Sequence, residues 1–108
     1  MLYYDFSAGG KDYKLRLNTR NLVLLEKQLG CNPLSIFGDG STIPPVSTMV
    51  QILHASLQQN HHGITLDKTY DIFDEYLEEQ SATDFLLVIV EIFKVSGLIK
   101  AEATIEKN

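Results

Sequence analysis

One apolar stretch near the C-terminal end, Phe85 to Ile99, constrains the fold more than any other feature; it reads FLLVIVEIFKVSGLI. Almost every side chain in it is apolar, whereas a helix on a protein surface also shows a polar side. A membrane span needs about 20 apolar residues, and this shorter stretch contains Glu91 and Lys94. We therefore expect the central helix of a small core, with most of its surface covered.

Length and composition indicate one small globular domain. The chain has 108 residues, of which 44% are hydrophobic and 21% charged, which is typical of a folded chain. Its net charge of −5 argues against nucleic-acid binding, because phosphate contacts need clustered Lys and Arg. The N-terminus lacks the basic start and apolar run of a signal peptide, and the single Cys31 fits a reducing compartment. We expect a cytoplasmic protein with no membrane-spanning part.

The first 17 residues have the pattern of a β-hairpin. Two runs rich in Tyr, Phe and Leu flank Gly9 and Gly10. Paired glycines supply the positive φ angles of a tight turn, so the spacing predicts a hairpin over residues 2–17. In the second run Tyr13, Leu15 and Leu17 alternate with charged residues, which predicts one apolar face. An isolated hairpin is marginally stable in water, so this face must rest on helices.

Four helices are predicted after the hairpin, over about residues 19–29, 46–59, 66–79 and 82–97. Asn18 and Thr65 are N-cap residues for the first and third, and Gly30 is placed to end the first. Ser81 with Asp84 resembles a capping box before the fourth. The sequence therefore predicts an α+β fold, an N-terminal β-hairpin followed by a small bundle of about four helices, in a single domain over residues 1–99. Residues 100–108 are expected to form a flexible polar tail.

The third predicted helix is amphipathic. Its apolar face is expected to carry Leu66, Tyr70, Phe73 and Leu77. Acidic residues dominate the opposite face, and they lack the residue order of a calcium-binding loop. We expect that face to be solvated.

No motif for catalysis, a cofactor or a metal is evident. The histidines are His54, His61 and His62, and no HxxxH or HExxH pattern joins them. The pair at 61 and 62 is expected to lie in a solvated loop. Cys31 is expected to be a buried or half-buried structural thiol. The glycine-rich stretches lack the order of a phosphate-binding loop. The sequence predicts no enzyme, no cofactor and no metal site.

Residues 13–38, which read YKLRLNTRNLVLLEKQLGCNPLSIFG, carry a family resemblance. The segment is similar to the opening of tail assembly chaperones from siphophages of Gram-positive bacteria and their prophages. Those proteins resemble it in a hairpin that leads to an L-x-x-L-E-x-x-L-G helix and a short N-P-L turn. Stretches similar to PVSTMVQILHASLQ and ITLDKTYDIFDEYLEE follow. The similarity covers about residues 2–99 and rests on the order of elements, because none of the motifs is catalytic.

The resemblance implies a non-enzymatic role in building a phage tail, in the host bacterial cytoplasm. Such chaperones are encoded just before the tape measure protein, which is a long helical chain. They are expected to bind that protein, keep it soluble and help recruit tail tube protein subunits. They also commonly occur as a longer form made by ribosomal frameshifting, and this chain would be the short form.

The expected binding surface lies on the hairpin and on the distal part of the last helix. A chaperone of a long helical chain needs adaptable apolar surface, as in helix-in-groove recognition. An unpaired strand edge can also add a strand from a partner or allow self-association. The candidate protein-binding residues are Tyr3, Tyr13, Leu15, Phe93, Val95, Leu98 and Ile99.

Two other classes of function stay open at this point. A small regulatory helical domain could bind nucleic acid through the basic residues of the hairpin region, although the acidic balance argues against it; these are Lys11, Lys14, Arg16 and Arg20. An enzyme or metal protein would need a cleft that brings together at least two of the residues His54, His61, His62 and Cys31.

Overall fold

The computed structural model describes residues 2–37 and 43–100. Two strands come first, β1 (Tyr4–Ala8) and β2 (Lys11–Leu15). The helices that follow are α1 (Thr19–Leu29), the short 3₁₀ helix η1 (Pro33–Phe37), α2 (Val46–Leu57), α3 (Leu66–Leu77) and α4 (Ala82–Val95). This order confirms the predicted α+β class. The helices α2, α3 and α4 each end two residues earlier than expected, and the predicted tail lies outside the described residues except for Lys100.

The hairpin forms because two glycines make its turn. Gly9 and Gly10 have φ angles of 58° and 75°, the left-handed region in which both central residues of a type I′ turn lie. The strands pair antiparallel, with Ala8 opposite Lys11, Phe6 opposite Tyr13 and Tyr4 opposite Leu15. This register puts the apolar residues of both strands on one face.

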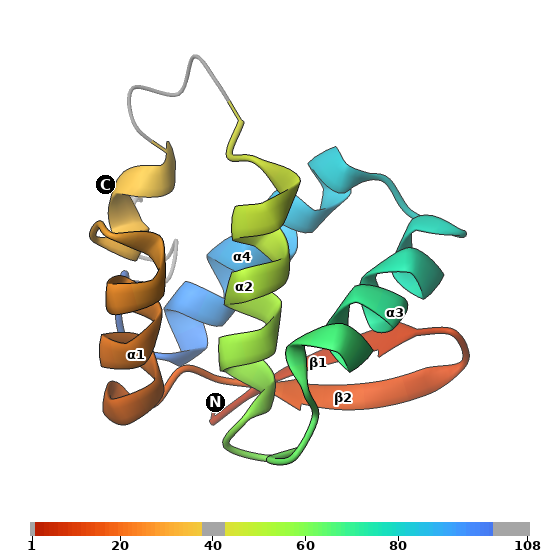
Figure 1. The fold of residues 1–108 in the computed structure, drawn as a ribbon, viewed down its shortest axis with the longest axis horizontal. Coiled ribbons are helices and arrows are strands. Elements are labelled where there is room, and N and C mark those ends of the chain that lie inside the picture. Colours follow the sequence, from red (N-terminus) through yellow and green to blue (C-terminus); the bar gives the residue numbers. More distant parts are fainter. Residues whose placement is uncertain (1, 38–42, 101–108) are drawn as a thin grey trace.

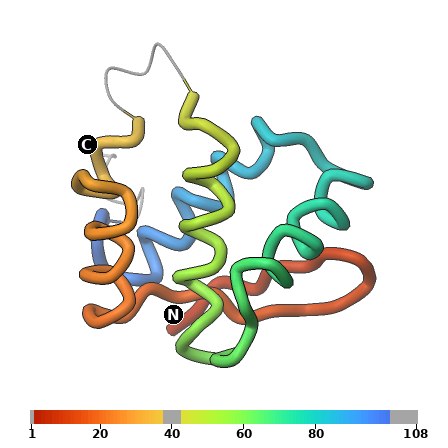
Figure 2. The backbone as a smooth tube through the Cα atoms, in the orientation of Figure 1, coloured from red at the N-terminus to blue at the C-terminus, as the bar shows by residue number. Residues whose placement is uncertain are grey.

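The helices stack over that face. In Figures 1 and 2, α2 lies at the centre, with α1 on one side and α3 on the other. The hairpin runs beneath α3, and α4 passes behind α2 and contacts both α2 and β1. The core lies between the hairpin, α2 and α4, and its largest fully buried side chains include Phe85, Phe93, Leu15 and Met49.

Most of the apolar stretch of α4 is core, as expected. Phe85, Val88, Ile89, Ile92 and Phe93 are buried. The helix begins at a complete capping box. The Ser81 hydroxyl accepts a hydrogen bond from the N–H of Asp84, and the Asp84 carboxylate accepts one from the N–H of Ser81. Burial on this scale explains why the stretch needs so few polar residues.

The predicted apolar face of α3 is wrong. Leu66, Tyr70 and Leu77 are exposed, and of the expected residues only Phe73 is buried. The buried face instead carries Thr69, Ile72, Phe73 and Tyr76. Both sets have helical spacing, and the observed one is rotated by about one residue, or 100°, around the helix. The observed face is the buried one because it places the Tyr76 ring beside that of Phe73 against Phe85. The ring centroids of Phe73 and Tyr76 lie 5.1 and 5.5 Å from that of Phe85.

Candidate functional site

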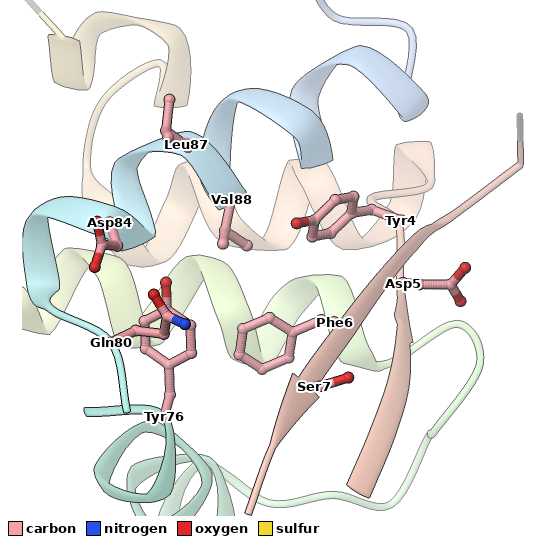
Figure 3. A pocket seen from close by; sticks show the side chains of 9 residues that line it. All are labelled: Tyr4, Asp5, Phe6, Ser7, Tyr76, Gln80, Asp84, Leu87 and Val88. Atoms are coloured by element: carbon pink, nitrogen blue, oxygen red, sulfur yellow. The ribbon is translucent and has the colours of Figure 1, made fainter. Parts of the chain in front are cut away.

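A groove opens beside β1, between that strand, the end of α3 and the first half of α4. We call it the β1 groove; its volume is about 410 Å³. Figure 3 shows the side chains around it. The aromatic rings of Tyr4, Phe6 and Tyr76 face it, and Leu87 and Asp84 stand on its α4 side. The lining residues are Tyr4, Asp5, Phe6, Ser7, Tyr76, Gln80, Asp84, Leu87 and Val88.

The backbone of β1 faces this groove with unpaired groups. A two-residue turn makes Ala8–Lys11 a hydrogen-bonded pair, and pairs of the two kinds then alternate along the ladder. Asp5–Lys14 and Ser7–Asp12 are therefore non-hydrogen-bonded pairs, whose N–H and C=O groups point away from the partner strand. Among the described residues, nothing donates to or accepts from the backbone of Asp5 or Ser7.

The outer edge of β2 is different, because the connection from α2 to α3 covers it. The N–H of Lys14 donates to His61 Nε2 at 2.8 Å, and its C=O accepts from Asn60 Nδ2 at 3.5 Å. Just beyond the strand, the N–H of Arg16 donates to the carbonyl oxygen of Ser56 at 2.9 Å. One edge of the hairpin is thus closed by the chain itself, and the other is open.

The groove floor is formed by aromatic rings that pack against one another. The Phe6 ring lies 5.3 Å from that of Tyr76 in a stacked arrangement and 6.0 Å from that of Phe85 edge-on. Burial raises the pKa of Tyr76 to about 12, with smaller contributions from Asp84 and Tyr4. The pKa of Tyr4 is also raised, first by burial and then by the charges of Glu91 and Asp5. Both hydroxyls are therefore protonated at neutral pH and offer hydrogen bonds.

The groove rim is acidic and partly apolar. Hydrogen bonds from Ser81 hold the pKa of Asp84 below its usual range, so its carboxylate is ionised at neutral pH. The Asp5 carboxylate points away from the groove, on the outer side of β1 (Figure 3), and none of the nine lining residues is basic. Leu87 is 70% exposed, more than any other large apolar residue of α4. This arrangement supports apolar contact with a ligand and hydrogen bonding to a cationic or polar one.

The candidate binding residues do not gather at this groove. Leu15 and Phe93 are fully buried and Tyr13 nearly so. In this fold their side chains pack inside the protein and are not exposed to a partner. Tyr3 is half-buried near the start of β1, with Lys14 Nζ 5.1 Å from the centre of its ring.

Val95 ends α4, and Leu98 and Ile99 lie just beyond it; all three are half-buried against other parts of the chain. Arg16 Nη1 donates to the carbonyl oxygens of Val95 at 2.7 Å and Leu2 at 3.2 Å, and the N–H of Leu17 donates to Ser96 Oγ at 2.8 Å. Phe37 packs edge-on against Phe93, with ring centroids 6.2 Å apart. Leu98 and Ile99 also lie against the core. The larger open apolar surface of α4 is therefore at Leu87, near its start.

The histidines and the cysteine lie apart from one another. His61 packs against Tyr13 with ring centroids 5.5 Å apart, so the loop that contains it is docked onto β2 rather than simply solvated. His54 faces a small pocket of about 40 Å³ between α1 and α2. Cys31 is exposed, so the expectation of a buried or half-buried thiol is wrong; the residue lies just beyond Gly30, which ends α1. No group of three His, Cys, Asp or Glu within the described ranges could hold a metal ion.

The basic residues considered for nucleic acid are split by the fold. Arg16 is engaged with the end of α4. Lys11, Lys14 and Arg20 are exposed, but Lys11 and Lys14 stand opposite Ala8 and Asp5 on the hairpin, and Arg20 belongs to α1.

Sequence reasoning missed Leu87 and the groove, although one signal for Leu87 was present. Leu87, Glu91 and Lys94 follow each other at spacings of four and three, so they share one stripe of α4. Glu91 and Lys94 form an ion pair at 3.3 Å. Two charged residues on a stripe mark it as the solvent side, and Leu87 belongs to that side.

Comparisons with known proteins add a family. Residues 5–107 match the model of a family described as "Family of unknown function (DUF6096)". Comparison with the curated proteins finds no match, and neither does comparison with the solved structures. In residues 2–37 and 43–100, no helix has the length and apolarity needed to cross a membrane.

Proposed function

We propose that this chain, which belongs to the family of unknown function DUF6096, is a phage tail assembly chaperone. It binds the tape measure protein in the host bacterial cytoplasm, keeps that protein soluble and helps to recruit tail tube subunits. The sequence resemblance over about residues 2–99 suggests this role. It is a binding role and requires no catalytic residue.

The β1 groove is the observation that carries the proposal. It combines an open strand edge, an aromatic floor and the exposed Leu87. Proteins can recognise a polypeptide segment by pairing its backbone with an open strand edge and by making apolar contacts beside that edge. A polypeptide is therefore the partner that this surface fits best.

Coexpression tests the proposal. The chain would be produced with the long helical protein encoded immediately downstream in the source genome, and copurification and partner solubility would be measured. We expect a soluble complex. Leu87→Lys is expected to weaken it, because the change puts a positive charge in place of the apolar contact on the rim. The matched control is Leu24→Lys on α1, where the side chain is 51% exposed and is not part of the groove lining.

Two results would contradict the proposal. One is a downstream protein that stays insoluble and does not copurify. The other is a complex that Leu24→Lys and Leu87→Lys weaken equally, which would show that the groove is not the binding site.

A further inference from the structure

We propose that the β1 groove binds an extended segment of a partner polypeptide as a third strand on the hairpin, and that this segment alternates basic and apolar residues. The inference rests on the proposed function for the identity of the partner. Its recognition chemistry comes from the free backbone groups of Asp5 and Ser7, the Asp84 carboxylate on the groove rim, the Asp5 carboxylate on the outer side of β1, and the exposed Leu87.

The backbone of β1 sets the conformation of the bound segment. Asp5 and Ser7 each present an outward N–H and C=O, spaced two residues apart along the strand. Their repeat is about 6.8 Å, which matches the repeat of a second extended chain. A helix does not match it, because its backbone groups are already paired within the helix. The strand has five residues, so a segment of about five to seven residues would cover it.

Alternation along β1 sets the side-chain pattern of the segment. Phe6 and Ala8 face the core, while Asp5 and Ser7 face solvent. An added strand continues this pleat. Its inward side chains would lie beside Val88 and Leu87 and should be apolar. Its outward side chains would lie beside Asp5 and should be basic.

Charge favours a basic partner over a second copy of this chain. The groove lining contains Asp5 and Asp84 and no cation. Two copies joined through β1 would bring both pairs of carboxylates together, and like charges across a sheet are destabilising. Each copy also carries a net charge of −5. A segment containing lysine or arginine would relieve the same repulsion.

A synthetic peptide provides the first test. The probe is a seven-residue acetylated and amidated peptide of alternating lysine and valine, titrated against the full chain by calorimetry. The matched control peptide has glutamate in place of lysine, and we expect it to bind at least about tenfold more weakly. Two further peptides carry N-methyl groups on alternate backbone amides. One peptide is methylated at the lysine amides and the other at the valine amides. Only one set faces β1, so we expect one of these peptides to lose binding and the other to keep it.

Two proline variants test the same edge from the protein side. Ser7→Pro removes an outward N–H of β1, and Asp12→Pro removes an outward N–H of β2. Both also remove the hydrogen bond from Ser7 Oγ to Asp12 Oδ1, which is 2.6 Å long. Proline is tolerated at edge positions whose N–H faces outward. We expect Ser7→Pro to weaken peptide binding about tenfold or more, the order expected for one lost hydrogen bond and its neighbours. Asp12→Pro should stay within about twofold of wild type.

Several results would overturn the inference. Equal binding by the two N-methylated peptides would indicate charge attraction without strand pairing, and this result does not depend on whether a variant folds. Equal effects of Ser7→Pro and Asp12→Pro, with unchanged circular dichroism, would have the same meaning. A concentration-dependent dimer that Ser7→Pro abolishes would assign the edge to a second copy.

The outcomes also separate this inference from the proposed function. If the downstream protein copurifies equally well with Ser7→Pro and with wild type, strand addition fails and the chaperone role stands. If the peptides behave as expected and the downstream protein does not copurify, the chaperone role fails and the groove chemistry stands.

Discussion

The two edges of one hairpin have opposite surroundings. The outer edge of β2 is bonded to the connection between α2 and α3, through His61 and Asn60. The outer edge of β1 has no such partner among the described residues and borders a groove of about 410 Å³. The strands have the same length and share one register, so their surroundings, not their own geometry, make the difference.

That difference separates stability from binding. Exposed strand edges promote unwanted pairing, and proteins usually cover or charge them. This chain covers the β2 edge with its own backbone and side chains, which ties the hairpin to α2. It leaves the β1 edge short and flanked by carboxylates, which discourages pairing with another copy. An edge kept open in this way suits a partner of opposite charge.

The largest expected effect is on stability, and it is seen by comparing a residue of β2 with a residue of the β1 groove. Leu15 on β2 is fully buried, and Leu87 on the groove rim is 70% exposed. We expect Leu15→Ala to lower the free energy of unfolding by about 2–5 kcal/mol because it leaves a core cavity. Leu87→Ala should change it by less than about 0.5 kcal/mol. Urea denaturation of both variants measures this, and similar losses in the two would show that Leu87 is part of the core.

A smaller effect is expected from the bond that closes the β2 edge. His61→Ala removes the acceptor of the Lys14 N–H and the ring packed on Tyr13. We expect a loss of about 1 kcal/mol, typical of one hydrogen bond in a partly exposed position. His62→Ala is the control, because His62 is the exposed neighbour. If both variants unfold at the wild-type urea concentration, the β2 edge does not depend on His61.

The smallest effect is a pH dependence of the same contact. Burial, and then the charge of Lys14, lower the pKa of His61 in the folded chain. The neutral ring is therefore favoured by folding, and this stabilisation is present above pH of about 6.5, the ordinary histidine value. It should be lost as the pH falls through the lowered value, because the unfolded chain takes up the proton first.

Urea denaturation between pH 7.5 and 5 is the measurement for this effect. We expect the difference between wild type and His61→Ala to shrink on acidification. A difference that grows as the pH falls would mean that the charged ring is the stabilising form.

Local patterns predicted much of the fold. Gly9 and Gly10 predicted the turn, and Ser81 with Asp84 predicted the start of α4; the structure confirms both. Asn18 and Gly30 cap α1 as expected. Each of these features is decided by residues close together in the sequence, so propensity and spacing were sufficient to find them.

Features decided by distant residues were not predicted. Two apolar stripes of α3 had the right spacing, and only the packing of Tyr76 against Phe85 and Phe6 selects one of them. The hydrogen bond from Arg16 to the carbonyl oxygen of Val95 joins residues 79 positions apart, and no sequence pattern predicted it. The groove requires β1 and α4 to lie at a particular separation, which periodicity within either element does not determine.

Amide hydrogen exchange, followed by NMR at each residue of the hairpin, tests the contrast between the two edges most directly. In the free chain we expect slow exchange at Lys14 and Arg16, whose N–H groups are bonded, and fast exchange at Asp5 and Ser7. Adding the lysine–valine peptide should slow exchange at Asp5 and Ser7 and leave Lys14 and Arg16 unchanged. Strong protection of Asp5 and Ser7 in the free chain, or no added protection with the peptide bound, would contradict an open edge that accepts a third strand.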